Sequence, residues 1–170
     1  SKIQFRADHF FPITPRIIWY ASFRTGFVRN LVDPTTVPED RFSQVGVPLI
    51  KRFALGGPGS LRGFKLQEIN FQNLLIQGTM AFTNYRSQID FPLAGNLKIG
   101  PFVDAGNLFA DKYSLSLSPD IIRYSAGIGL HYQTPVGPVN FDWGFKLNRD
   151  PADPDKSESD QEFHFSVGIL

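Results

Sequence analysis

The feature that most constrains this chain is a two-residue alternation of apolar and polar side chains, which recurs in segment after segment. It is clearest near the C-terminus, in 121–134 and 139–148. In the second segment Phe141, Trp143 and Phe145 alternate with polar residues or glycine. Successive side chains of a strand point to opposite faces, so this period predicts β-strands with one oily and one polar face. A soluble sandwich would turn the oily face inward, whereas a membrane barrel turns it to lipid and keeps the polar face for the lumen.

Composition further narrows the classes of protein to which this chain can belong. The 170 residues suffice for one domain, which we expect to span 1–170, and the net charge of +1 gives no electrostatic case for nucleic acid. No apolar run approaches the ~18 residues of a transmembrane helix, but a barrel strand needs only about 9–11 residues with every second one apolar. The absence of cysteine excludes a disulfide scaffold, a cysteine nucleophile and thiolate zinc sites.

The alternation divides the chain into strands joined by short turns and long loops, a pattern typical of outer-membrane barrels. A switch of parity near Thr83-Asn84 predicts a β-bulge there, and 44–54 is a candidate for one extra strand. No helix is expected. We therefore predict an all-β fold, a transmembrane antiparallel up-and-down β-barrel of about eight strands. The confident strands are 2–13, 16–30, 74–91, 97–109, 121–134, 139–148 and 162–170.

One long loop, about 31–73, is rich in proline, glycine and charge, and a loop of this length in a compact protein is usually functional. By parity, Asp90, Phe102 and Asp104 lie on the polar faces of their strands. A guanidinium suits a carboxylate and can lie on an aromatic ring, so Arg62 is a candidate partner for them. Spacing alone leaves open that Arg62 is a solvated loop residue. The loop motif comprises Gly56, Gly57, Leu61, Arg62, Gly63 and Phe64.

This motif resembles the lid-loop signature of the outer-membrane insertase superfamily, which includes BamA, TamA and the two-partner secretion transporters. That signature is a glycine-rich run followed by Val/Ile-Arg-Gly-Phe/Tyr, so Leu61 is a mild departure. Further motifs follow in the family's order, and the resemblance spans essentially the whole chain. They are the acidic strand 89–92, the Phe-x-Asp-x-Gly strand 100–106, the strand and turn 125–130 and 134–138, and the closing strand with Phe163, Phe165 and Gly168.

The resemblance implies a specific contact. In the family the loop folds back into the lumen, where its arginine pairs with the Phe-x-Asp-x-Gly strand. Carried over, Arg62 would meet Asp104 and stack on Phe102, with Asp90 nearby and Gly106 completing the motif.

The resemblance also sets a problem of size. Family members usually carry about twice as many strands, preceded by periplasmic POTRA domains, and this chain matches the C-terminal half without such domains. A half sheet has two unpaired edges, and unpaired backbone in lipid costs several kcal/mol per group. Closure into a small barrel, association of several copies, and membership of a longer protein all remain open. We expect a homo-oligomer. No signal peptide is visible, so we expect a mature or trimmed chain.

We expect no catalytic, cofactor or metal site, and hence no enzyme. His9, His131 and His164 lack ligand spacing, and the last two have inward parity suited to hydrogen bonds in the lumen. Ser60 lacks the Gly-x-Ser-x-Gly nucleophile elbow, and the glycine run lacks the Lys-Ser/Thr of a phosphate loop. The acidic segment 149–161 is expected to be a solvated loop.

The resemblance implies the bacterial outer membrane of a Gram-negative cell envelope. It implies a short insertase-family barrel in outer-membrane biogenesis or organisation, with membrane lipids, further copies and other outer-membrane proteins as partners. Two alternatives remain. One is a structural or lipid-organising oligomer without insertase activity. The other is a pore or translocator, which needs a wider lumen than about eight strands supply.

Overall fold

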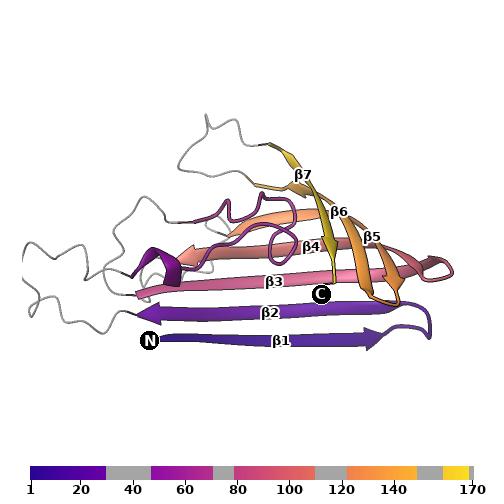
Figure 1. Cartoon of the computed structure of the whole chain (residues 1–170), viewed down its shortest axis with the longest axis horizontal. Helices are drawn as coiled ribbons and strands as arrows, with labels where there is room; N and C mark the ends of the chain where they lie inside the picture. The colour runs from indigo at the N-terminus through magenta and orange to yellow at the C-terminus, as the bar shows by residue number, and fades with distance from the viewer. Residues whose placement is uncertain (30–46, 71–78, 110–121, 149–158, 169–170) are drawn as a thin grey trace, which may run out of the picture.

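The computed structural model describes residues 1–29, 47–70, 79–109, 122–148 and 159–168. In these ranges seven strands form one antiparallel sheet in sequence order, as Figure 1 shows. One 3-10 turn, η3 (Leu49–Lys51), interrupts the long loop. None of the described segments forms a helix with the length and apolar character that crossing a membrane requires. The strands are β1 Lys2–Pro12, β2 Ile18–Arg29, β3 Thr79–Ala94, β4 Leu97–Phe109, β5 Arg123–Thr134, β6 Gly137–Lys146 and β7 Gln161–Val167.

The prediction of an all-β up-and-down sheet is confirmed, but the described strands number seven rather than about eight, and the sheet is open. β1 pairs with β2 alone and β7 with β6 alone, so both edges lack a partner within the described part of the chain. The extra strand predicted over 44–54 is wrong for residues 47–54, while 44–46 lie outside the described residues. Within 47–70 the backbone turns back on itself, and a bridge between Leu55 and Ile69 joins the two limbs of the loop.

The bulge predicted near Thr83-Asn84 is also wrong. β3 pairs with β2 in unbroken register from Thr79 to Asp90, and its irregularity lies at Pro92/Ala94, next to a proline that cannot donate to the ladder. The parity switch has another cause. Met80 and Phe82 are buried on the inner face because the loop covers that face, whereas the apolar residues farther along β3 face outward.

The two faces of the sheet have different surroundings. The outer face exposes large apolar side chains along every strand, as a lipid-facing surface requires. The sheet curls, and the loop 47–70 lies within the curl (Figure 1). An apolar cluster therefore fills the space between the loop and one end of the inner face. It comprises Val47, Phe53, Leu55, Leu61 and Phe64 from the loop and Val28, Met80, Phe82 and Leu108 from the sheet.

Candidate functional site

The glycine run folds the loop into a compact turn. Gly56 and Gly57 have φ angles of 114° and 94°, in the left-handed region that side chains resist. The Gly57 amide donates to the carbonyls of Leu61 and Phe64, at 3.1 and 2.9 Å. The Ser60 hydroxyl accepts from the Gly56 amide at 2.8 Å. These hydrogen bonds hold the backbone on both sides of Arg62, so the side chain projects from a fixed turn toward the sheet.

Arg62 is bound to Asp104 on β4 by three hydrogen bonds. Its backbone amide and Nε donate to Asp104 Oδ2 at 3.0 and 2.9 Å, and its Nη2 donates to Oδ1 at 2.8 Å. The side chains are 1% and 0% exposed. The guanidinium also lies over the Phe102 ring, 3.6 Å from its centroid. The contacts implied by the family resemblance are therefore present, in the bidentate geometry that a lysine could not reproduce.

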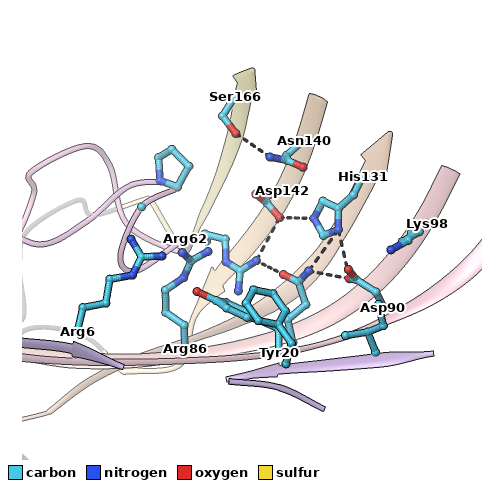
Figure 2. A pocket seen from close by; sticks show the side chains of 15 residues that line it. Arg6, Tyr20, Arg62, Arg86, Asp90, Lys98, His131, Asn140, Asp142 and Ser166 are labelled. Atoms are coloured by element: carbon cyan, nitrogen blue, oxygen red, sulfur yellow. Dashed lines mark hydrogen bonds and ion pairs between the residues drawn. The ribbon is translucent and has the colours of Figure 1, made fainter. Parts of the chain in front are cut away.

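Two further residues contact the guanidinium, a third contacts both of them, and the motif comparison missed all three. Gln88 accepts from Arg62 Nη1, and Asp142 Oδ1 lies 3.4 Å from the same nitrogen. His131 lies 3.4 Å from Asp142 and 3.3 Å from Asp90, so it bridges the two carboxylates (Figure 2). All three lie on the polar face of their strands by parity, which was the available signal.

Asp90 is near Arg62 without touching it. Its Oδ1 accepts from Gln88 Nε2 at 2.7 Å, and Gln88 in turn binds Arg62. We call Arg62 and its partners Asp104, Phe102, Gln88 and Asp142 the anchor. Burial alone would lower the pKa of Arg62, but the charges of Asp104 and Asp142 outweigh it, so the pKa is raised and the anchor stays ionic.

The loop makes a second set of contacts beyond Phe64, which we call the arm (64–68). Lys146 Nζ binds Glu68 Oε1 at 2.5 Å and lies 4.9 Å from the Phe64 ring centroid. His164 Nε2 lies 3.1 Å from the Phe64 carbonyl oxygen, so this histidine does bond in the lumen. Lys65 lies 3.9 Å from Glu162. The arm therefore connects the loop to β6 and to the edge strand β7.

Glycines, which have no side chain, let the loop backbone approach the sheet closely. A Cβ on Gly144 of β6 would lie 2.6 Å from the Arg62 carbonyl carbon and 2.7 Å from the Gly63 nitrogen. A Cβ on Gly63 would lie 2.6 Å from the Ser125 Cβ. Gly106 has a different role, because its added Cβ would meet the Thr83 carbonyl of the neighbouring strand at 2.7 Å.

The residues predicted for the closing strand lie away from the anchor. Phe163 and Phe165 are exposed on the outer face, and their rings lie 6.1 and 4.9 Å from that of Phe141. Gly168 follows β7 with a φ of 76°, and its amide donates to the Pro138 carbonyl at 2.8 Å. These residues shape the edge strand rather than the loop site. Within the described ranges, no group of three or more His, Cys, Asp or Glu residues is arranged to hold a metal ion.

The family follows from the whole sequence. Residues 1–169 match the Omp85 superfamily domain. The chain belongs to the Omp85 superfamily. The predicted resemblance to the BamA/TamA insertase barrel and the bacterial outer-membrane location are thereby confirmed.

Two relatives are described as outer membrane protein assembly factor BamA. The protein of Nitratidesulfovibrio vulgaris Hildenborough is 27% identical over 74% of this chain, and that of Neisseria meningitidis serogroup B is 23% identical over 72%. This chain spans 16% and 19% of their lengths. The crystal structure of Haemophilus ducreyi BamA lacking POTRA domains 1–3 has the same fold over 96% of this chain and 34% of its own, with a TM-score of 0.66 at 20% identity.

Proposed function

We propose that this Omp85 sheet serves outer-membrane protein assembly, with the docked loop as its working part. The observation that carries the proposal is the buried contact of Arg62 with Asp104, which holds the loop against the inner face. The relatives named as assembly factors support it. The work would be binding and templating rather than bond-making, since the sequence offers no nucleophile with a base.

The edges of the sheet suggest how templating would proceed. β1 and β7 each present unpaired backbone donors and acceptors within the described part of the chain. Such an edge adds an incoming strand readily, because main-chain hydrogen bonds form without regard to sequence. The arm reaches the β7 edge through His164 and Glu162. A docked loop would thus hold the β7 backbone in the extended conformation with which a client strand pairs.

The same edges favour a second proposal, that several copies associate. Unpaired backbone in lipid is costly, and pairing between copies would remove that cost. A homo-oligomer that organises lipid or structure without insertase activity would use the same surfaces. Native mass spectrometry of the detergent-extracted chain separates these cases. A defined multiple of 19.1 kDa with retained lipid supports association, while a single chain at all concentrations contradicts it.

Assembly activity can be tested in vesicles. The full chain is reconstituted, an unfolded outer-membrane β-barrel is added, and its folding is followed by heat-modifiable mobility on gels. We expect faster folding than in vesicles that hold an unrelated barrel, and a marked loss of that gain in Arg62→Ala. Lys51→Ala, which removes an exposed loop charge away from the anchor, should keep it. Equal rates in the chain and in the unrelated barrel would reject the assembly role.

A further inference from the structure

A cavity of about 320 Å³ lies between the loop and the inner face, and every strand of the described sheet contributes to its wall. One part of that wall is cationic. Arg6 from β1 and Arg86 from β3 point into the cavity beside Arg62 of the anchor (Figure 2). Phe10 and Ile18 line the same cavity, so a charged wall adjoins an apolar one.

Arg86 is the underpaired member of this wall. Its side chain is 14% exposed, and its Nε is buried without a hydrogen-bond partner among the described residues. The nearest carboxylate oxygen, Asp104 Oδ1, lies 3.8 Å away and already accepts from Arg62 Nη2 at 2.8 Å. A buried guanidinium donor left unsatisfied is unfavourable, so this site lacks an acceptor.

Neighbouring arginines add further positive charge around Arg86. Arg62 and Arg24 repel Arg86, and Arg6 repels Arg24, so four guanidinium groups act on one another. Two carboxylates are committed to them, Asp104 to Arg62 and Asp8 to Arg6. Both carboxylates are thus held by other arginines, and neither is committed to Arg86.

A third carboxylate near the cluster, Asp142, is not committed to Arg86 either. Asp142 lies 3.4 Å from Arg62 and 3.4 Å from His131, so it is shared between those two groups.

We propose that this cavity binds a phosphate group, held by Arg86 and Arg6. A phosphate monoester carries about −1.5 to −2 charge at pH 7, so one such group can face both arginines. Its oxygens suit the planar fork of a guanidinium and would supply the acceptor that Arg86 Nε lacks. Phe10 and Ile18 would contact the organic part of the ligand. The proposal stands independently of the assembly role.

Binding can be measured on the full chain in neutral detergent and in lipid. Calorimetric titration with inorganic phosphate tests the group alone. Nanodiscs of phosphatidylcholine with or without phosphatidic acid, followed by lipid retention in native mass spectrometry, test the lipid source. We expect Arg86→Gln to weaken binding about tenfold or more and Arg6→Gln to weaken it less, because a hydrogen bond to a charged group is lost. The matched control is Lys98→Gln, which removes one positive charge from the same cavity near Asp90.

Each outcome decides the proposal. Saturable binding of inorganic phosphate that Arg86→Gln weakens supports a site for the free group. Arg86-dependent retention of phosphatidic acid without phosphate binding supports a lipid headgroup. Equal losses in Arg86→Gln and Lys98→Gln would mean general attraction and would overturn the site, as would no saturable binding in either arm. Heat-modifiable mobility checks that each variant folds, and Arg86→Lys, which keeps the charge without the fork, should be intermediate.

Discussion

The loop is held to the sheet in two regions that differ in burial and in chemistry. At the anchor, Arg62 and Asp104 are both fully buried and meet through a fork of hydrogen bonds. Along the arm, Lys146 is buried beside Glu68, but Lys65 is 63% exposed and lies 3.9 Å from Glu162. The anchor contacts β3, β4 and β6, whereas the arm contacts β6 and the edge strand β7.

This difference indicates that the anchor and the arm have separate roles in holding the loop. A buried fork accepts one geometry, because a shift of the guanidinium would leave charges unpaired in a dry site. An exposed ion pair at longer distance is screened and tolerates movement. The anchor should therefore set where the loop lies, and the arm should adjust the edge of the sheet. Substitutions at the anchor and along the arm test this division.

The largest effect is expected from Arg62→Ala, which removes the guanidinium that binds the buried Asp104 and Asp142. Removing one partner of a buried pair typically costs about 3–5 kcal/mol, and the loop should leave the inner face. The free energy of unfolding from urea titration in vesicles measures the first effect. For the second, the chain contains no cysteine, so the maleimide labelling rate of a Ser60→Cys probe reports loop release without background. Ser60 is buried in the docked loop.

Arg62→Lys is the matched control for charge. Lysine keeps the positive charge, but its ammonium group cannot form two parallel hydrogen bonds to Asp104 or stack flat on the Phe102 ring. We therefore expect most of the loss in the free energy of unfolding to persist. Full recovery by lysine would show that charge alone holds the loop, and the anchor would then differ from the arm only in degree.

An intermediate effect is expected from Gly144→Ala, which tests the anchor without touching its charges. The new methyl group would press on the backbone of Arg62 and Gly63, and overpacking of this kind costs about 1–3 kcal/mol. Gly59→Ala is the control in the loop, because a Cβ there meets nothing within 4 Å. We expect it to change stability by no more than about 1 kcal/mol. If the Ser60→Cys probe labels equally in both variants, close approach at Gly144 does not govern docking.

The sequence predicted the sheet and much of the anchor because both leave local signals. Alternation identified all seven strands, and the predicted bounds of β4, 97–109, agree with the structure. The Leu-Arg-Gly-Phe and Phe-x-Asp-x-Gly motifs predicted that Arg62 meets Asp104 and Phe102. Parity placed the inward side chains correctly along most strands because it depends only on the strand period.

What the sequence could not predict depends on register and on the loop. Gln88, Asp142 and His131 come together because neighbouring strands place them around Arg62, and alternation does not specify which strands pair at which residue. The false bulge at Thr83-Asn84 has a different origin, which is the loop. Met80 and Phe82 look misplaced on a polar face until the loop's own apolar side chains are seen to cover them.

The smallest effects are expected along the arm, where Glu68→Gln and Lys65→Ala separate its two ion pairs. Glu68 accepts from Lys146 Nζ and from the Lys65 backbone amide at 2.7 Å, so losing its charge should cost about 1.5 kcal/mol. Lys65→Ala should cost no more than about 0.5 kcal/mol, since its pair with Glu162 is exposed and long. Hydrogen exchange of the β7 amides should quicken in Glu68→Gln while β2 stays unchanged, because the arm meets the edge strand and the anchor keeps the loop in place. A larger effect from Lys65→Ala, or equal quickening in β2, would contradict the division between anchor and arm.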